Sequence, residues 1–332
     1  MSASAETTVL RWPFRNGLAR VNVLILLLIL EIALFGTLKP TYVSLAGLLD
    51  ASRAFVEAGL LALGMTLVVI TGGIDLSVAS LLALVSVTVG FSSAAGTPLP
   101  LSLVFGVVVG LLGGLLNGLI IAGLNLHPLV VTLGTMALYR GLAYAVTNAN
   151  AVSTFPDWFA SIGQAYLWDL VPFQLIVWLL AVVAVWMLLS KTSFGRYVYG
   201  LGINERATLF SGVDVFTVKV SVYVLSGLFA AIAAIIQTSR VFTARANAAT
   251  GLELTVIAMV ALGGTTITGG SGSILGTTLG VLVLAYLQDG LAFIGVRNDW
   301  ALVVTGVILV LTVFTNDFFS RKRQLTPQAF NQ

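Results

Sequence analysis

The residues of this chain that could do chemistry are polar side chains set within long apolar runs. Between Pro128 and Tyr144, the hydroxyl residues Thr132, Thr135 and Tyr139 recur at three- and four-residue spacing, which places them on one face of a helix. Hydroxyls in such a row can replace the water that a hydroxylated solute loses, or they can bond one helix to the next. The spacing therefore indicates either the lining of a polar pathway or interhelical bonding, and both readings stay open.

Two glycine-rich stretches carry further polar residues. The first is TGGIDLS at residues 71–77, which includes Asp75 and Ser77, and the second is GGTTITGGSGS at residues 263–273. Within a lipid bilayer, irregular backbone persists only where it is buried in protein or lines a wet cavity. Each stretch is therefore a candidate for a polar pathway or a broken-helix joint, with a tight turn at the membrane surface as the alternative. Asp75 could also cap the helix that resumes after it.

The residue inventory excludes several kinds of site. Cysteine is absent and His127 is the single histidine, so a Cys-ligated or multi-His metal site cannot form, and we expect no metal or cofactor in this chain. The second glycine stretch resembles a phosphate-binding loop only superficially, because no G-x-x-x-x-G-K-[ST] pattern occurs in the chain. The chain therefore cannot hydrolyse ATP by that route. The sequence shows no pairing of a nucleophile with a base and no set of metal ligands that would indicate an enzyme.

The composition places these residues in a membrane protein. The 332 residues are 58% hydrophobic and 9% charged, and the mean hydropathy is +1.04, whereas soluble domains carry about 25% charged residues. The net charge of +3 needs no nucleic acid to explain it. We predict an all-α polytopic protein in a lipid bilayer with about ten transmembrane helices. These spans are expected near residues 21–38, 54–71, 76–92, 100–122, 128–147, 172–189, 215–239, 253–268, 272–289 and 299–316.

The distribution of basic residues predicts the orientation. An even number of spans puts both termini on one side, and if that side is cytoplasmic, ten of the 16 Lys and Arg residues lie at or inside the inner boundary. We therefore predict a cytoplasmic tail over 1–20, a transmembrane domain over 21–316 with a cytoplasmic loop over 190–214, and a cytoplasmic tail over 317–332. The longest external segment, 148–171, is rich in aromatic residues, which suits an interfacial anchor, or else a gate or docking surface for an external partner.

Glycines at strict four-residue spacing predict close helix packing. Glycines on one ridge of a helix let another helix approach backbone to backbone, and an amide such as that of Asn117, beside the first ridge, can bond across the contact. The two ridges are Gly106, Gly110, Gly114 and Gly118, and then Gly272, Gly276 and Gly280.

Three charged residues inside predicted spans have local interpretations. Glu31 is expected to face other helices and to hydrogen-bond there. Thr250 and Glu253 match the capping box at a helix start. Arg140 lies past the middle of its span, so its guanidinium is expected to reach outward to the membrane surface.

The longest charged interruption, residues 190–213, predicts a short capped helix outside the membrane. Asn204 is a good N-cap, Glu205 lies in the first turn where the helix dipole favours an anion, and Gly212 is a good helix stop. Ala207 and Phe210 recur at helical spacing and give this helix a small apolar face beside its charges. A connecting loop without a partner would not need that face.

Four stretches together resemble a known family. They are GGIDLSVAS (72–80), PLVVTLGTMALYRGLAY (128–144), GRYVYGLGINERATLFSGV (195–213) and ELTVIAMVALGGTTITGGSGSILGT (253–277). In this order they resemble the permease subunits of bacterial sugar ABC importers of the ribose, xylose, rhamnose and autoinducer type. Ala79 stands where the first motif usually has glycine, so the backbone at that one turn has less conformational freedom than in the usual motif.

The resemblance implies a fold, partners and a coupling site. It implies a type II-like importer permease in the bacterial inner membrane, a second permease subunit, a cytoplasmic ABC ATPase that binds ATP and Mg, and a periplasmic sugar-binding protein. It also implies a cytoplasmic coupling helix that sits in a groove of the ATPase. The matching residues here are Asn204, Glu205, Arg206, Ala207, Phe210, Ser211 and Gly212.

A second function class stays open on composition alone. An ion-gradient-driven secondary transporter of a small polar solute would use an intramembrane acid such as Glu31, Glu57 or Asp75 as its proton or cation site. The two classes differ in their source of energy, because an importer subunit is inert without its ATPase. Candidates for the solute's path through either protein are Asp75, Ser77, Asn117, Thr132, Thr135 and Tyr139.

Overall fold

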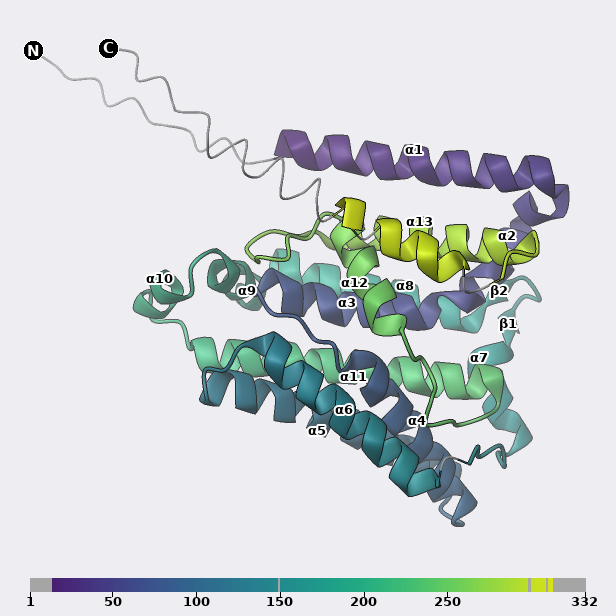
Figure 1. The fold of residues 1–332 in the computed structure, drawn as a ribbon, viewed down its shortest axis with the longest axis horizontal. Coiled ribbons are helices and arrows are strands. Elements are labelled where there is room, and N and C mark those ends of the chain that lie inside the picture. The colour runs from purple at the N-terminus through teal and green to yellow at the C-terminus, as the bar shows by residue number, and fades with distance from the viewer. Residues whose placement is uncertain (1–13, 149, 298–299, 309, 313–332) are drawn as a thin grey trace, which may run out of the picture.

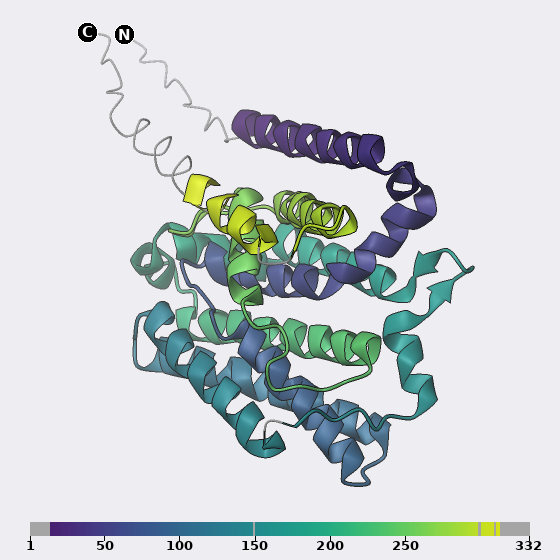
Figure 2. The same cartoon turned by 45° about the vertical axis from the view of Figure 1, so that its right-hand side comes forward.

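The computed structural model describes residues 14–148, 150–297, 300–308 and 310–312, which are helical almost throughout. The predicted C-terminal tail and most of the predicted N-terminal tail lie outside these residues. The long helices run side by side along one direction, in layers from α1 (Phe14–Leu38) at one edge to α5 (Leu99–Gly123) and α6 (Pro128–Thr147) at the other (Figures 1 and 2). The prediction of a helical, multi-pass membrane protein is confirmed.

The remaining elements connect or interrupt these long helices. In chain order they are η1 (Pro40–Val43), α2 (Leu45–Ala51), η2 (Ser52–Ala54), α3 (Val56–Ile70), α4 (Val78–Ala94), η3 (Asp157–Phe159), α7 (Ala160–Gln164), β1 (Tyr166–Leu167), β2 (Val171–Pro172), α8 (Phe173–Lys191), α9 (Ser193–Ile203), α10 (Glu205–Phe210), α11 (Val215–Val241), α12 (Leu252–Leu262) and α13 (Ile274–Phe293). Strands β1 and β2 form an antiparallel hairpin. We call the two ends of the bundle the α10 end and the hairpin end.

Among the described residues, six helices are long and apolar enough to cross a membrane. They are α1 from Arg20, α5, α6, α8, α11 and α13, and α3 forms a seventh if the segment from Leu45 to Ala54, bent by 60° against it, is counted as part of one span. Helices α4 and α12 are shorter, as is an apolar helix from Trp300. The predicted span over 253–268 differs from α12, which ends at Leu262 because Gly263 and Gly264, the latter at φ +91°, turn the chain away.

Helix α11 lies at the centre of the bundle, between α3 on one side and α4 and α5 on the other. Glycines allow the closest of these contacts: a Cβ on Gly110 would lie 2.6 Å from the Cβ of Ala231, and one on Gly114 would lie 2.2 Å from the carbonyl oxygen of Tyr223. A Cβ on Gly118 would likewise come within 2.8 Å of Val220, whereas Gly106 faces Val89 of α4. The α5 glycines thus set the spacing of α11 and α4.

The second glycine set is divided by the start of a helix. Gly276 and Gly280 lie in α13. A Cβ on Gly276 would lie 2.1 Å from the carbonyl oxygen of Gly263, and one on Gly280 would lie 2.2 Å from the carbonyl oxygen of Met259 in α12. Gly272 is not part of this ridge, because it precedes α13. The helix begins at Ile274, and Ser273 caps it by accepting a hydrogen bond from the amide of Gly276. Its own neighbours are Ile70 and Thr265.

Hydroxyl pairs and an aromatic cluster complete the packing. Thr66 of α3 bonds Thr277 of α13 at 2.8 Å, and Ser86 of α4 bonds Thr238 of α11 at 2.7 Å, so buried hydroxyls join helices that are distant in sequence. At the hairpin end, Phe159 of η3 is fully buried in an aromatic cluster. The predicted external segment therefore contains short helical turns packed on the bundle.

Candidate functional site

A buried polar cluster forms where the chain breaks between α3 and α4. One oxygen of the Asp75 carboxylate accepts hydrogen bonds from the amide of Ser77 at 3.0 Å and from its hydroxyl at 2.6 Å. The other oxygen accepts from Ser226 of α11 at 3.0 Å. Asp75 is 1% exposed, so these three donors take the place of water around its carboxylate. Asp75 does not cap α4 as predicted, because Ser77 stands at the N-cap position and no side chain makes a cap hydrogen bond there; Asp75 accepts from the amide of Ser77 itself.

Asn117 of α5 completes the cluster. Its amide nitrogen donates to the Ser77 hydroxyl at 2.8 Å, and its oxygen is buried without a partner. The chain of bonds from Asn117 through Ser77 and Asp75 to Ser226 thus joins α5, the break and α11. These four residues come from three separate stretches of the sequence, which meet only in the fold.

The hydroxyl stripe on α6 faces the protein interior. Thr132 donates to the carbonyl of Ile74 in the break at 3.0 Å, and Tyr139 donates to the carbonyl of Gly113 in α5 at 2.8 Å. Thr135 is buried and donates within its own helix. The neighbouring Val130 and Leu133 are 65% and 41% exposed. In this conformation the stripe bonds α6 to the break and to α5.

The two glycine-rich stretches contact each other. The amide of Gly270 donates to the carbonyl of Ile70 at 2.8 Å, and Tyr199 of α9 donates to the carbonyl of Gly272 at 2.9 Å. Gly202 of α9 lies against the end of α3 and against the second stretch, since an added Cβ would be 1.8 Å from the Ile70 oxygen and 2.4 Å from the amide nitrogen of Gly270. Both breaks therefore meet beside the helix that leads into α10.

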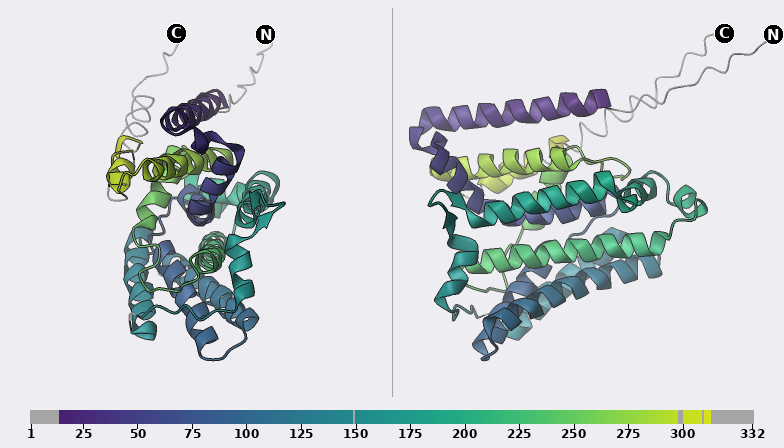
Figure 3. Two further views of the ribbon diagram at one scale, coloured as in Figure 1. Left: turned by 90° about the vertical axis from the view of Figure 1, so that its right-hand side faces the viewer. Right: turned by 180° about the vertical axis from the view of Figure 1, so that it is seen from behind.

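Helix α10 projects beyond the ends of the neighbouring helices (Figures 1 and 3). The Asn204 side chain caps it by accepting from the amide of Ala207 at 3.0 Å, and Gly212, at φ +82°, follows its end. Phe210 is 87% exposed, and Leu209, which the sequence analysis did not single out, is 55% exposed. The helix therefore presents large apolar side chains that no described part of this chain covers. The other predicted coupling residues, Glu205, Arg206, Ala207 and Ser211, are also exposed.

An ion pair ties α10 to α11. Lys219 Nζ lies 2.6 Å from Glu205 Oε1. At the start of α11, the side-chain and backbone hydrogen bonds that Thr217 donates to Asp214 lower the pKa of that carboxyl below its ordinary value. Both contacts fix how the chain leaves α10.

A cavity of about 320 Å³ lies beside this ion pair at the α10 end. Its lining includes Gly73 of the first break, His127 before α6, and Glu205, Lys219 and Tyr223. The sequence analysis missed Lys219, Tyr223 and Ser226. Their spacing of four and three residues puts them on one face of α11, and polar side chains at helical spacing in an apolar helix are the signal that could have found them.

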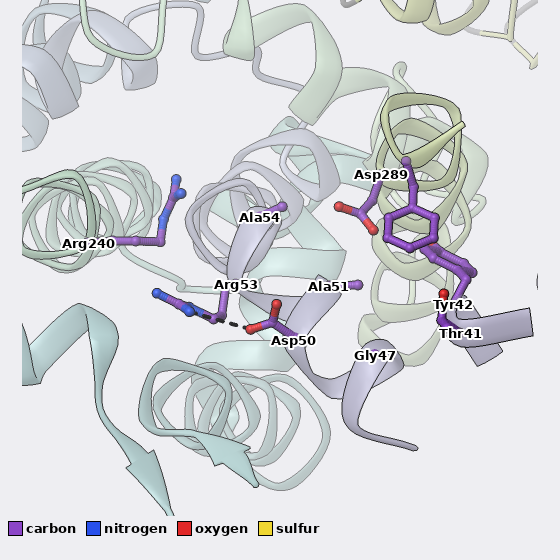
Figure 4. Close-up of a pocket in the computed structure, with 10 residues that line it drawn as sticks. Thr41, Tyr42, Gly47, Asp50, Ala51, Arg53, Ala54, Arg240 and Asp289 are labelled. Atoms are coloured by element: carbon purple, nitrogen blue, oxygen red, sulfur yellow. Dashed lines mark hydrogen bonds and ion pairs between the residues drawn. The ribbon is translucent and has the colours of Figure 1, made fainter. Parts of the chain in front are cut away.

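A second cavity, of about 300 Å³, lies toward the hairpin end (Figure 4). Asp50 and Arg53 face each other across 3.4 Å, Arg240 approaches from α11, and Asp289 approaches from α13. Tyr166 of the hairpin donates to Asp50, and burial together with this bond raises the pKa of the tyrosine. The cavity has carboxylates and guanidinium groups on its walls, which suits polar contents.

Other charged residues differ from the sequence predictions in their partners. Glu57 is paired with Arg240 at 2.8 Å, which makes it part of a structural ion pair. Arg140 does not reach outward, because its guanidinium donates to the carbonyls of Ala246 and Ala248 in the loop before α12. The capping box prediction is wrong: α12 begins after Gly251, and the Thr250 hydroxyl turns back to Asn247.

Within the described residues, no group of three or more His, Asp or Glu side chains could hold a metal ion. The Glu31 carboxylate on α1 has one buried oxygen without a hydrogen-bond partner. These acids therefore form no multidentate cation site in the described part of the chain.

Comparison with known proteins places the chain in a family. Residues 47–313 match the family described as the permease component of branched-chain amino acid transport systems. The ribose import permease protein RbsC of Bacillus subtilis is 40% identical over 288 residues, which cover 86% of this chain and 89% of the relative. The corresponding protein of Escherichia coli K12 is 37% identical over 89% of this chain and 92% of its own length.

A permease of a different transport system is similarly close. The autoinducer 2 import system permease protein LsrD of Klebsiella pneumoniae is 36% identical over 88% of this chain and 90% of its own length. No solved structure matches the chain. The resemblance inferred from the four sequence motifs is confirmed, and the chain belongs to the family of ABC importer permeases that includes the ribose and autoinducer-2 permeases.

Proposed function

We propose that this chain is the permease subunit of an ATP-driven importer that passes a sugar or sugar-like solute across the inner membrane. The observation that carries the proposal is α10, a capped helix that projects from the bundle with Phe210 87% exposed. A large apolar side chain outside the membrane is stabilised by burial against a partner. A cytoplasmic ATPase with a groove for this helix supplies that burial, and it is the subunit that binds ATP and Mg.

The solute class follows from the relatives and from the polar residues inside the bundle. The relatives are named as permeases for ribose and for autoinducer 2, and the interior of this chain carries hydroxyls and amides that bond hydroxyl groups well. The proposed path runs past Asp75, Ser77, Asn117, Thr132, Thr135 and Tyr139. Because these side chains are now hydrogen-bonded to one another or to backbone carbonyls, the path opens only when the helices around the break separate.

The remaining parts of the assembly follow from the same proposal. The hairpin end faces the periplasm and receives the solute from a binding protein, and the α10 end and both termini face the cytoplasm. A second permease, identical or homologous, completes the translocation unit. Helices α4 and α12 and the segment from residue 300 bring the number of membrane segments to about ten, in a type II-like arrangement.

The secondary transporter gains no support from its proposed ion sites. Glu57 is paired with Arg240, and both oxygens of Asp75 accept hydrogen bonds from Ser77 and Ser226. Both acids therefore already have partners within this chain.

Reconstitution tests the proposal directly. The chain is placed in proteoliposomes with its partner ATPase and binding protein, and uptake of radiolabelled D-ribose, D-xylose and L-rhamnose is measured. We expect ATP-dependent uptake of one of these sugars by the complete assembly and none by the chain alone. Uptake by the chain alone, driven by a proton or sodium gradient, would contradict the proposal.

A further inference from the structure

We propose that the cavity at the α10 end is a binding site for a neutral, hydroxylated solute, occupied after the solute has passed the break between α3 and α4. This inference rests on the proposed import function and names a site for its solute. The cavity volume of about 320 Å³ is within the range of small-molecule sites in proteins. Its walls combine apolar side chains, such as Ile121 and Leu126, with a few polar groups.

The first argument is an unused hydroxyl. Tyr223 lines the cavity and is 2% exposed, yet its hydroxyl has no hydrogen-bond partner. Buried tyrosine hydroxyls usually find a partner, because leaving one unpaired costs free energy. A solute hydroxyl in the cavity supplies that partner, as donor or acceptor.

The second argument is the balance of charge. Glu205 and Lys219 are on the cavity wall and pair with each other at 2.6 Å, so their charges largely cancel. A phosphorylated or carboxylated solute would need an unpaired cation, and a cationic solute would need an unpaired acid. A sugar needs neither, because it is bound through hydrogen bonds to polar side chains such as those of Thr71, Asn125 and His127.

The third argument is the position of the cavity between the polar cluster and α10. A Cβ on Gly73 would lie 2.6 Å from the Tyr223 hydroxyl, so this hydroxyl touches the backbone of the break. One helical turn further along α11, Ser226 bonds Asp75. At the other end of the same face, Lys219 holds α10. A movement of α10 would therefore change the wall of this cavity and the contacts of the break together.

Cysteine protection tests the site in a chain that has no native cysteine. Leu126 lines the cavity, whereas Leu124, two residues earlier and also exposed, does not. The variants Leu126→Cys and Leu124→Cys are made in the complete importer, in inside-out membrane vesicles. Labelling by a charged maleimide is then timed with and without the sugar that the uptake panel of D-ribose, D-xylose and L-rhamnose identifies. We expect the sugar to slow labelling of Leu126→Cys several-fold and to leave Leu124→Cys unchanged.

A second variant assigns the effect to the hydroxyl. Tyr223→Phe, combined with Leu126→Cys, should raise the half-protecting sugar concentration about threefold to tenfold, the effect of one lost hydrogen bond. Tyr286→Phe is the matched control, because it removes a half-buried tyrosine hydroxyl that bonds the carbonyl of Leu48 away from this cavity. It should leave the half-protecting concentration unchanged.

The outcomes separate this inference from the proposed function. If the complete importer takes up a sugar but that sugar protects neither cysteine, or protects both equally, the site is wrong while the import function stands. Protection that Tyr223→Phe leaves unchanged would overturn the role of the hydroxyl. If none of the sugars is taken up and none protects Leu126→Cys, the proposed function and this inference both fail.

Discussion

The amide of Gly270 donates a hydrogen bond to the carbonyl of Ile70 across 2.8 Å, which joins two interruptions that lie 200 residues apart in the chain. Ile70 ends α3, and its carbonyl has no intrahelical donor, so an amide from another segment satisfies it. Gly202 of α9 packs over the same point. The two breaks and the segment that leads into α10 therefore form one contact, and displacement of any of the three will strain the others.

Phe210→Asp should uncouple the chain from its ATPase. The substitution puts a charge on the most exposed apolar side chain of α10 and would leave it desolvated in a partner's groove. We expect normal amounts of folded permease in the membrane, loss of ATPase copurification and loss of uptake. Phe210→Tyr, which keeps the ring, is the control and should retain both. Normal copurification with Phe210→Asp would show that α10 is not the coupling element.

Reversing the charge of Lys219 alone should weaken the coupling of ATP hydrolysis to transport, and exchanging the charges of Glu205 and Lys219 should restore it. Lys219→Glu places two carboxylates side by side and should lower the number of solutes moved per ATP. The double variant Glu205→Lys with Lys219→Glu should recover much of that ratio, measured from uptake and phosphate release in parallel. If the single and double variants behave alike, the pair does not position α10.

Asp75→Asn should fold and transport, whereas Asp75→Leu should not accumulate. An asparagine oxygen can still accept from Ser77, and its amide can donate to Ser226, so uptake should fall by no more than about threefold. Leucine leaves buried donors unpaired, at about 1–3 kcal/mol each. Expression level and thermal unfolding in detergent measure the difference. Complete loss of uptake by a stable Asp75→Asn protein would favour an ion-binding carboxylate.

Thiol labelling should show when the hydroxyl stripe of α6 meets solvent. Thr135 is 6% exposed and Thr132 is fully buried, so cysteine at either position should resist a water-soluble reagent in the resting protein. If the stripe lines the path, labelling at these positions should rise during ATP turnover. Leu133→Cys, which faces away from the interior, serves as the comparison. Labelling that stays low during turnover would show that the stripe only bonds helices to one another and does not line the path.

Gly110→Leu should prevent correct assembly of the bundle. At this position even a Cβ would lie 2.6 Å from Ala231 and 2.7 Å from the carbonyl of Gly227, so a leucine must push α5 and α11 apart. Gly141→Leu on α6 is the matched control, because nothing lies within 4 Å of its added Cβ. We expect Gly110→Leu to fail in size-exclusion chromatography and Gly141→Leu to elute normally. Equal behaviour of the two would show that the α5–α11 contact is not essential.

Much of the architecture and one end of the candidate site could be predicted from the sequence, because their signals are local. Long apolar runs identify membrane helices whatever their neighbours, and the Asn204 cap and the stop at Gly212 act within a few residues. The four motifs likewise identify the family in chain order. Each of these features depends on residues that are close together along the chain.

Only the tertiary structure decided which polar groups meet. Nothing in the local pattern predicts that Asp75 bonds Ser226, that Glu57 pairs with Arg240, or that Gly270 satisfies Ile70. Local rules also failed at Thr250 and Glu253, where a capping box is present in sequence but the helix begins after Gly251. The physical reason is that a buried polar group in a membrane protein takes its partner from whichever helix packs against it, and the packing of helices is set by the whole set of contacts, not by the residues on either side.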